Sequence, residues 1–555
     1  GVWKKGALAG ICLERLRVFE PVLRTRRHTG QTLQLIYLHK KESSAKVMCG
    51  IVAYIGKKGG TRKASDVLVK GLKRLEYRGY DSAGIGVMKD DGSLGLVKKV
   101  GKVINLDNAV QAGAQDVRDA TLGIAHTRWA THGVPSDRNS HPHANGEQTL
   151  CVVHNGIIEN YATLKQGLQQ KGYEFRSETD TEVLAHLVDE IRARSQQSLS
   201  FEEAVGLALC QVHGTFGVCF VDAKNPDVLV GARHGSPLIL GIGENEEEFF
   251  LASDAAAIVE YTRQVVYLEE GDIVTITRGQ DGSMKYEISS LHSSRASYDS
   301  AMFDALMLLA EEKGDTEDLR HQSAERKTDT LELSLASIEK AGHKHFMLKE
   351  VLEQPQVLRN CLRGRVNSDT NFIQLGGVLQ VMDKLVAARR FVICACGTSW
   401  HSGLVGEYLI EDLARVPVEV EYASEFRYRK PILYPDDVII VISQSGETAD
   451  TLAAVREAKR QGCLTIGFVN SVGSTIARET DAGCYLHVGP EIGVASTKAF
   501  TGQIMVLTMF ALMLAKHKKT LPEEKITEYL KVVESIPDHV ATVLKQCDDI
   551  ADISR

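Results

Sequence analysis

Short alternations of apolar and polar residues dominate the chain between residues 51 and 277. β-Branched runs typical of strands occur at Ile51–Ile55, Gly84–Val87, Leu150–Val153, Gly217–Val221 and Ile273–Thr277. Helical periodicity interrupts them at Lys63–Leu75 and Thr181–Arg194. This order predicts stacked sheets with flanking helices and not a parallel βαβ array.

From Gln374 onward the pattern changes to alternating strands and helices. The strands are expected at Phe391–Ala395, Val418–Tyr422, Val438–Ile442 and Leu464–Val469. Helices are expected from about Ser402 and over Thr448–Arg460. This alternation predicts a doubly wound parallel sheet, so the whole chain belongs to the α/β class. The apolar run Ile504–Ala515 is shorter than the ~18 residues of a membrane-spanning helix and is interpreted as a buried helix.

The changes of pattern and composition divide the chain into five segments. Residues 1–48 form an extension, 49–278 a first domain, 279–345 an insert rich in Ser, Glu, Asp and Lys, 346–525 a second domain, and 526–555 a helical connection. A chain of 555 residues is long enough to bury several cores. The insert is expected to be an inter-domain linker.

Composition narrows the function classes. The chain is 43% hydrophobic and 25% charged, as in globular proteins, and its net charge of −7 argues against nucleic acid as the main partner. The 11 cysteines include no pair separated by two residues, which excludes zinc-ribbon and thioredoxin-like sites. We therefore expect reduced thiols in a cytoplasmic protein.

The extension differs from the rest of the chain in charge. Residues 1–47 carry ten Lys or Arg against three Asp or Glu and lack the apolar core of a secretory signal. Three interpretations stay open: translated upstream sequence, a transit peptide or a pro-segment. Met48 is a suitable start, which favours the first interpretation and predicts that the mature protein lacks residues 1–48.

Removal of Met48 would make Cys49 the first residue. Its thiol, with an ordinary pKa of ~8.5, and its α-amine, with an ordinary pKa of ~7.7–8.0, are well matched, so the amine could take the thiol proton near neutral pH. The position of Cys49 therefore predicts a nucleophile that needs no separate histidine base.

Later segments supply the groups that such a nucleophile needs. Asn155 and Gly156 could donate hydrogen bonds to an oxyanion, Arg128 could clamp a carboxylate, and Asp180 could hold an ammonium group. Each has an ordinary alternative: packing of an Arg-Trp pair, a hairpin turn at Asn-Gly, and a helix N-cap at Asp180.

The joint pattern resembles a known family. Met48–Ile51, Arg78–Gly84, Ala125–Gly133, His154–Asn160 and Ser177–Glu182 are similar to the type II, N-terminal-nucleophile glutamine amidotransferases. They look most like the glutaminase domain of glutamine–fructose-6-phosphate aminotransferase (isomerising).

This resemblance implies an αββα glutaminase domain in which Cys49 attacks the glutamine amide and Asn155 and Gly156 form the oxyanion hole. It implies that glutamine is held by Arg128, Trp129, Thr131, His132 and Asp180, with Trp129 also shielding the path of ammonia. The family uses no metal or other cofactor, so His141-Pro142-His143 is interpreted as a pair of hydrogen-bonding loop histidines.

Two hydroxyl-rich turns follow strands of the second domain. Cys396-Gly397-Thr398-Ser399 and Ser443-Gln444-Ser445-Gly446-Glu447-Thr448 each join a strand to a helix. Such turns place N–H groups and hydroxyls at a helix N-terminus, where the dipole favours an anion such as phosphate. No Gly-Lys-Ser/Thr follows, so neither is a nucleotide P-loop. The alternative is that these residues merely cap helices.

The second turn resembles the signature of sugar isomerase (SIS) lobes, and Glu491–Phe500 also matches that family. The resemblance implies that sugar phosphate is bound by Thr398, Ser399, Ser443, Gln444, Ser445, Thr448 and Val494. The family continues into a second lobe that carries a Schiff-base lysine. Lys498 lies in the first-lobe segment and is not that lysine, so the chain is expected to be incomplete at its C-terminal end.

The resemblance as a whole implies an enzyme of hexosamine synthesis. It would aminate fructose 6-phosphate to glucosamine 6-phosphate with ammonia released from glutamine and passed internally. We expect a cytoplasmic homo-oligomer, dimer or tetramer, without nucleic-acid or membrane partners. Three alternatives stay open: an amidotransferase acting on phosphoribosyl pyrophosphate, for which no pyrophosphate loop is found, a glutaminase-only chain, and a non-catalytic sugar-phosphate-binding regulator.

Overall fold

In the computed structural model, residues 47–555 form one unit. The structure describes residues 49–76, 79–113, 115–129, 133–195, 199–279, 281–291, 326, 328–331 and 339–554. The extension, most of the insert, and Thr131 and His132, which the resemblance predicts to bind glutamine, lie outside the described residues.

The first domain contains two stacked, mainly antiparallel sheets. The eight-stranded sheet has the order β14-β11-β9-β10-β1-β4-β2-β3, and the six-stranded sheet has the order β13-β12-β8-β7-β6-β5. The strands of the first sheet are β1 Gly50–Gly56, β2 Ser82–Met88, β3 Leu94–Val100, β4 Leu122–Arg128, β9 Ile239–Ile242, β10 Glu248–Ala252, β11 Gln264–Tyr267 and β14 Asp329–Thr330. Those of the second are β5 His143–Ala144, β6 Leu150–Ile158, β7 Gly214–Asp222, β8 Asn225–His234, β12 Asp272–Arg278 and β13 Met284–Ser290.

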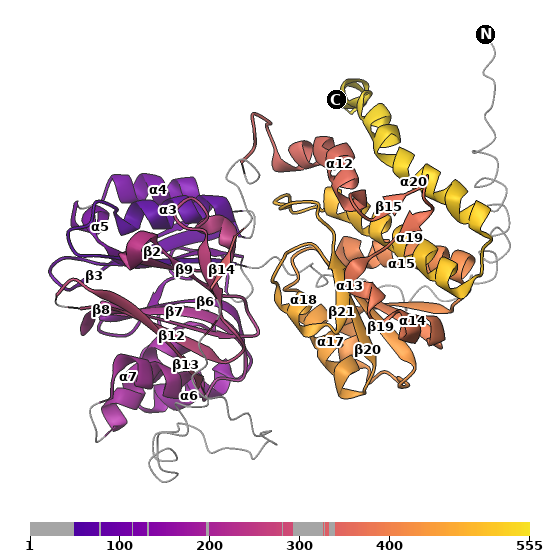
Figure 1. Cartoon of the computed structure of the whole chain (residues 1–555). Coiled ribbons are helices and arrows are strands. Elements are labelled where there is room, and N and C mark those ends of the chain that lie inside the picture. Colours follow the sequence, from indigo (N-terminus) through magenta and orange to yellow (C-terminus); the bar gives the residue numbers. More distant parts are fainter. Residues whose placement is uncertain are drawn as a thin grey trace, which may run out of the picture. The chain divides into compact units, whose positions relative to one another are not determined.

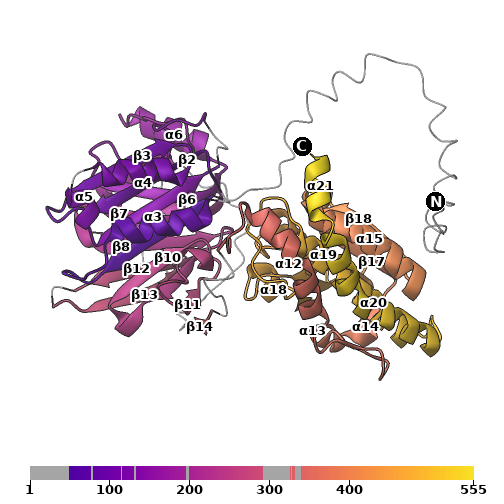
Figure 2. The same ribbon diagram turned by 90° about the horizontal axis from the view of Figure 1, so that it is seen from above.

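Alternation along each strand explains the layers. In β1, Ile51, Ala53 and Ile55 pack between the two sheets, whereas Val52 and Tyr54 pack toward helices on the opposite face. The helices on that face are α3 Ala64–Leu75, α4 Val103–Gln111 and α5 Gln115–Asp119; the other sheet is covered by α6 Tyr161–Gln170, α7 Glu182–Arg194 and α8 Phe201–Leu209. Figures 1 and 2 show α3 and α4 lying over the strands. The predicted αββα architecture and all five predicted strands are confirmed.

The sheets reach further along the chain than the sequence indicated. β13 pairs with β12 over seven residues, and β14 pairs with β11. Both strands lie in the segment 279–345 that was expected to be a linker. The expected boundary at residue 278 therefore falls inside the six-stranded sheet. The two strands were not predicted because edge strands with one exposed face carry many polar residues.

The second domain is a parallel sheet of order β18-β17-β19-β20-β21. Its strands are β17 Arg390–Ala395, β18 Val418–Tyr422, β19 Asp437–Ser443, β20 Leu464–Val469 and β21 Ala482–Tyr485. One face packs against α15 Gly397–Ala414 and α19 Lys498–Lys518, and the other against α16 Ala423–Tyr428, α17 Ala449–Arg460 and α18 Thr475–Glu479. The prediction of a doubly wound sheet is confirmed.

Shorter elements and further helices complete this domain. They are α12 Phe346–Leu362, α13 Gly376–Leu379, α14 Met382–Ala387, α20 Glu523–Leu544, α21 Cys547–Ile553 and the hairpin of β15 Val366–Asn367 and β16 Phe372–Ile373. One predicted boundary is wrong: α15 begins at Gly397 and not near Ser402, since Gly397 adopts φ of +58° and lets the strand turn directly into the helix.

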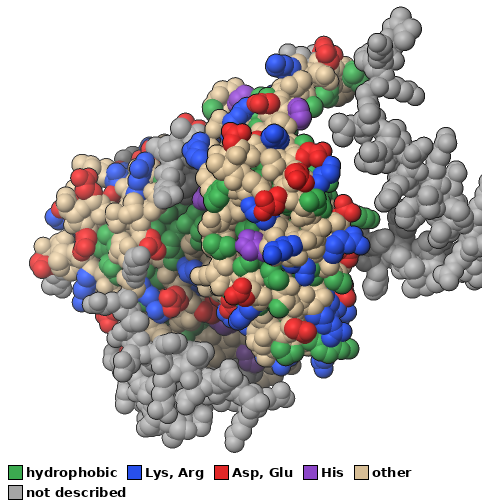
Figure 3. Space-filling view, turned by 45° about the vertical axis from the view of Figure 1, so that its right-hand side comes forward, with side chains coloured by type: hydrophobic (Ala, Val, Ile, Leu, Met, Phe, Trp, Pro, Cys, Tyr) green, Lys and Arg blue, Asp and Glu red, His purple; other side chains and the backbone are tan. Residues whose placement is uncertain are grey.

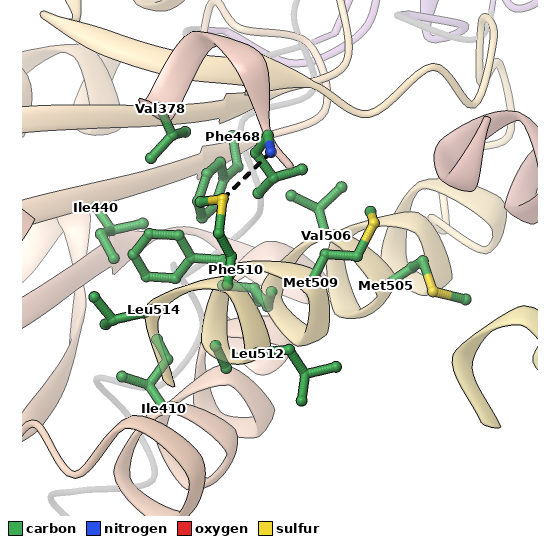
Figure 4. Packing of buried hydrophobic residues seen from close by; sticks show 14 of the residues in the cluster. Val378, Ile410, Ile440, Phe468, Met505, Val506, Met509, Phe510, Leu512 and Leu514 are labelled. Atoms are coloured by element: carbon green, nitrogen blue, oxygen red, sulfur yellow. Dashed lines mark hydrogen bonds between the residues drawn. The ribbon is translucent and has the colours of Figure 1, made fainter. Parts of the chain in front are cut away.

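Helix α19 is the centre of the second core. By length and composition it could cross a membrane, but 78% of its most apolar window is buried inside the fold. Phe510 packs edge-to-face against Phe391 and Phe468 of the sheet, and the Met513 sulfur accepts a hydrogen bond from the Leu375 N–H (Figure 4). It is a core helix of the parallel-sheet domain. On the face drawn in Figure 3, acidic and basic side chains lie intermingled, consistent with the modest net charge.

Candidate active site

Cys49 lies at the start of β1, beside the end of β4. The two strands pair antiparallel with Gly50 opposite Thr127, and the Gly50 N–H donates to the Thr127 hydroxyl at 3.1 Å. The Trp129 N–H donates to the Cys49 sulfur at 3.2 Å. Burial raises the pKa of the Cys49 thiol, whereas the Trp129 N–H and the Arg128 charge lower it. The predicted nucleophile is thus half-buried beside a backbone donor.

Asn155 and Gly156 lie in the long strand β6 and not in a hairpin turn. The Asn155 side-chain amide donates to the Cys49 carbonyl oxygen at 2.8 Å, which places an N–H donor next to the nucleophile. Gly156 has φ of +136°, and a Cβ there would lie 1.9 Å from the Thr215 carbonyl oxygen, so no other residue fits. Gly156 is exposed and follows Asn155 directly in the strand.

Arg128 and Asp180 bring one positive and one negative group to this place. Arg128 is 3% exposed and donates to the Gly133 carbonyl at 3.1 Å. Asp180 is not the N-cap of α7, which is Thr181; its carboxylate accepts from the Ile158 N–H at 2.9 Å. Arg128 lowers and Asp180 raises the pKa of the Cys49 thiol, so both charges act on the nucleophile.

A buried carboxylate that the sequence did not single out holds the loop before Asp180. Glu182 accepts hydrogen bonds from the Ser177 N–H at 2.6 Å and the Arg176 N–H at 2.8 Å. Burial alone would raise the pKa of Glu182, but the nearby His186 ring and the hydrogen bonds from Ser177 and Arg176 outweigh it and hold the pKa at about 2. The sequence could have indicated Glu182, because it follows Thr179 by three residues at the start of a helix, which is the spacing of a capping box.

The histidines of His141-Pro142-His143 make hydrogen bonds inside the domain. The His141 Nδ1 accepts from the His154 N–H at 3.4 Å, and the His143 Nε2 lies 3.1 Å from the Thr179 hydroxyl. Within the described ranges, no group of three or more His, Cys, Asp or Glu side chains is arranged to hold a metal ion. The hydrogen-bonding part of the interpretation is confirmed for both, but the loop assignment holds for His141 only, since His143 begins strand β5 and pairs with Val152.

The two hydroxyl-rich turns lie side by side at the carboxyl edge of the parallel sheet. β17 pairs with β18 on one side and β19 on the other, so the direction of chain progression reverses between β17 and β19. Open α/β sheets bind ligands at such a switch point. Thr398 and Ser399 lie in the first turn of α15, and Thr448 is the N-cap of α17.

The hydroxyls at this edge differ in how far they are already engaged. The buried Ser443 hydroxyl accepts from the Gly446 N–H at 2.9 Å and lies 3.3 Å from the Thr448 hydroxyl. The buried Ser399 hydroxyl accepts from the Gln503 amide at 2.9 Å. Thr398 is exposed, and Gln444, Ser445 and Thr448 are half-buried. Thr448 does not cap α17 with its side chain, which weakens the pure capping interpretation.

Val494 is 63% exposed in a loop that follows β21. This loop is held by Glu350 of α12, whose carboxylate accepts from the Ile492 N–H at 2.5 Å and the Gly493 N–H at 3.0 Å. Local sequence gave no signal for Glu350 or Gln503, because each acts on a residue more than 100 positions away.

Comparisons with known proteins agree with both halves of this arrangement. The family described as "Glutamine amidotransferase domain" matches residues 126–260, and the SIS domain family matches residues 384–513. The chain is 50% identical over 507 residues to the glutamine–fructose-6-phosphate aminotransferase [isomerizing] of Chlorobaculum tepidum, covering 91% of this chain and 76% of that protein. The protein of the same name from Bacteroides thetaiotaomicron is 49% identical over 508 residues, covering 92% and 76%.

Among solved structures, the C-terminal domain of glucosamine-fructose-6-phosphate aminotransferase from Francisella tularensis matches 39% of this chain and 60% of its own. The identity is 38% and the TM-score 0.37, too low for an argument about the fold.

Proposed function

Because the chain belongs to the glutamine–fructose-6-phosphate aminotransferase (isomerising) family, we propose that it uses glutamine to aminate fructose 6-phosphate to glucosamine 6-phosphate. Ammonia would be released at Cys49 and passed internally to the sugar. The observation that carries the glutaminase half is the Asn155 amide, which donates to the carbonyl oxygen of Cys49 itself at 2.8 Å.

The glutaminase step follows from these groups. Once Cys49 is the first residue, its α-amine takes the thiol proton and the sulfur attacks the carbonyl carbon of the glutamine amide. The Asn155 side chain and the Gly156 N–H donate to the oxyanion that forms. Collapse of the tetrahedral intermediate breaks the C–N bond, and the departing nitrogen receives the proton as ammonia. Water then cleaves the thioester to glutamate and restores the thiol.

Recognition of glutamine needs two opposite charges at a fixed separation. Arg128 would clamp the α-carboxylate and Asp180 the α-ammonium group, with Trp129, Thr131 and His132 completing the pocket. Both charged residues are buried, at 3% and 5% exposure, so their interaction with a charged ligand is weakly screened. This arrangement favours an amino acid over a simple amide.

The sugar phosphate would bind at the switch point of the parallel sheet. The N-termini of α15 and α17 lie at this edge, where their N–H groups favour an anion. The hydroxyls of Thr398, Ser399, Ser443, Ser445 and Thr448 would bind the phosphate, with Gln444 and Val494 lining the site. A phosphate dianion can be held there without lysine. Ammonia would add to the sugar carbonyl, loss of water would give an imine, and isomerisation of the imine would give the amino sugar.

The experiment is to measure glutamate and glucosamine 6-phosphate formed from glutamine by the chain beginning at Cys49, with and without fructose 6-phosphate. Formation of both products supports the proposal. Glutamate without amino sugar would indicate glutaminase activity only, and product formed with phosphoribosyl pyrophosphate instead would indicate the other amidotransferase. Undiminished glutamate formation by a Cys49→Ala variant would favour a non-catalytic regulator with a contaminating activity.

We also propose a cytoplasmic homo-oligomer, dimer or tetramer, without nucleic-acid or membrane partners. Support for the compartment comes from the cysteines of the described part, all of which are free thiols, as expected in a reducing environment. Light scattering at several protein concentrations would measure the oligomeric state.

A further inference from the structure

We propose that His126 is a positioning residue that fixes the Asn155 side-chain amide with its nitrogen, and not its oxygen, toward the oxyanion. This role rests on the proposed glutaminase function. Nothing in the resemblance assigned a role to His126, which stands two residues before Arg128 in the same strand.

The contacts of His126 determine which ring nitrogen carries the proton. Its Nε2 lies 3.0 Å from the His154 carbonyl oxygen and 3.1 Å from the Asn155 Oδ1. Both partners are oxygens that accept hydrogen bonds, so Nε2 must be the donor. An amide whose oxygen is held by this N–H presents its NH2 group elsewhere, and here that group donates to the Cys49 carbonyl oxygen.

The two residues come from different sheets. His126 lies in β4 and pairs with Ile51 of β1, whereas Asn155 lies in β6 of the second sheet. Side chains alternate along β4, so His126 reaches across to Asn155 while the Thr127 hydroxyl accepts from the Gly50 N–H in the same sheet. Two consecutive residues of β4 therefore hold the two parts of the site: His126 holds the Asn155 amide, and Thr127 holds the backbone next to Cys49.

The imidazole is held in one orientation and one charge state. His126 is 1% exposed, and its ring stacks on that of His141 with centroids 4.0 Å apart. Burial, together with His154 and Arg128, lowers the pKa of His126 to about 3. Among the described residues Nδ1 has no hydrogen-bond partner, so a second proton there would be buried without an acceptor. The neutral ring with Nε2–H is thus present throughout the working pH range.

Without this constraint the amide could rotate by half a turn. Asn155 Oδ1 would then face the developing negative charge, and the donor would be lost. Removal of one oxyanion donor lowers kcat by about 10²–10³ in hydrolases of this chemistry. The attack of the thiol on an electrophile that forms no oxyanion would be unaffected, which separates positioning from general damage to the site.

Two substitutions and one control test the role in the full chain beginning at Cys49. His126→Leu removes the donor, whereas His126→Gln retains an N–H at a similar reach from the backbone. Ile124→Ala is the matched control, because Ile124 is fully buried on the same face of β4 and belongs to the core between the sheets. For each protein we would measure kcat and KM for glutamine hydrolysis, the rate of Cys49 alkylation by iodoacetamide, and the unfolding midpoint.

We expect His126→Leu to lower kcat by roughly 10²-fold with alkylation within about twofold of wild type. His126→Gln should recover most of kcat, with the apparent pKa values of the rate profile unchanged. Equal losses of hydrolysis and alkylation in His126→Leu would indicate a merely structural role, as would a loss of kcat in Ile124→Ala of similar size. Disappearance of one limb of the pH profile in His126→Gln would instead make His126 a proton-transfer group.

The proposed function and this inference fail in different ways. A wild-type chain that releases no glutamate rejects both. A wild-type chain that releases glutamate, with His126→Leu folded and equally active, rejects the role of His126 alone.

Discussion

The two candidate sites are built by different means. The glutaminase site is assembled from strands of two sheets, and its polar side chains are buried and hydrogen-bonded: the His126 ring to the Asn155 amide oxygen, and the Asp180 carboxylate to the Ile158 backbone N–H. The sugar-phosphate edge uses helix N-termini and hydroxyls, most of them half-buried or exposed. Buried polar networks fix donor directions before substrate arrives, whereas the hydroxyls of a helix start can adjust to an anion.

The difference extends to ionisable groups. The buried histidines of the described residues are His126, His141, His143, His154 and His186, all in the first domain. The pKa values of His126, His141 and His143 are lowered by burial. The first domain therefore carries an acid sensitivity from buried histidines, whereas no described histidine of the parallel-sheet domain is buried.

The largest expected effect separates the two sites completely. Cys49→Ala removes the nucleophile and should lower glutamine hydrolysis at least about a thousandfold. Fructose 6-phosphate binding, measured by calorimetry, should stay within twofold because the sulfur has no part in that site. Cys219→Ala, a buried core cysteine in the same domain, is the control and should retain hydrolysis. Parallel loss of sugar binding in Cys49→Ala would contradict the separation.

A backbone change should affect only the sugar-phosphate edge. In Gly446→Ala the added Cβ would lie 1.9 Å from the Ser474 Oγ and 2.4 Å from its Cβ, at a φ of +68°. We expect fructose 6-phosphate binding to weaken by more than about tenfold, with basal glutamate release retained. Gly397→Ala is the comparison, because its φ of +58° costs about 1 kcal/mol but its Cβ meets open space.

Equal losses of fructose 6-phosphate affinity in Gly446→Ala and Gly397→Ala would mean that the cost of positive φ, and not the clash with Ser474, weakens binding. Calorimetric titration and thermal unfolding of both proteins decide this point.

A smaller effect should come from one hydroxyl. Thr448→Val removes a hydroxyl 3.3 Å from that of Ser443 while keeping the side-chain shape. Loss of one hydrogen bond to a charged ligand should weaken fructose 6-phosphate binding by roughly tenfold. Thr542→Val in α20, whose hydroxyl donates to the Asp538 carbonyl oxygen, is the control. Unchanged affinity in Thr448→Val would show that the Thr448 hydroxyl takes no part in sugar-phosphate binding.

The smallest effect is a difference in acid sensitivity. Between pH 6.5 and 5 the unfolded chain protonates its histidines, whereas folded His126, with a pKa of about 3, stays neutral. The unfolded state then binds more protons, so stability falls as pH falls, by at most about 1.4 kcal/mol per pH unit for each such histidine. Glu182, with a pKa of about 2, adds a loss only below its ordinary value of 4.5.

Hydrogen exchange of amides in β4 and β6, compared with β17 and β19 at pH 7 and 5.5 and corrected for intrinsic rates, would measure this difference. Protection should fall more in β4 and β6. A uniform change over both domains would show that the buried histidines do not dominate the response, and His126→Gln should reduce the difference.

Periodicity determined most of the fold. Alternation predicted β1 and β7, and the change to strand–helix units predicted the parallel sheet. Both predictions were possible because the spacing of apolar residues reflects which faces of an element are buried. Periodicity missed β13 and β14, because their polar residues at sheet edges show little alternation. It also placed the start of α15 five residues late, because Gly397 lets the strand turn directly into the helix without a separate loop.

The sequence by itself determined the chemistry available at each site: a cysteine that can become the first residue, an amide and a glycine for an oxyanion, opposite charges for an amino acid, and two hydroxyl-rich helix starts. Only the tertiary structure decided their directions. Asn155 faces Cys49 with its nitrogen because His126, from another sheet, holds its oxygen, and the loop carrying Val494 is fixed by Glu350 from α12. Hydrogen bonds between residues far apart in the chain depend on packing, and no local pattern encodes them.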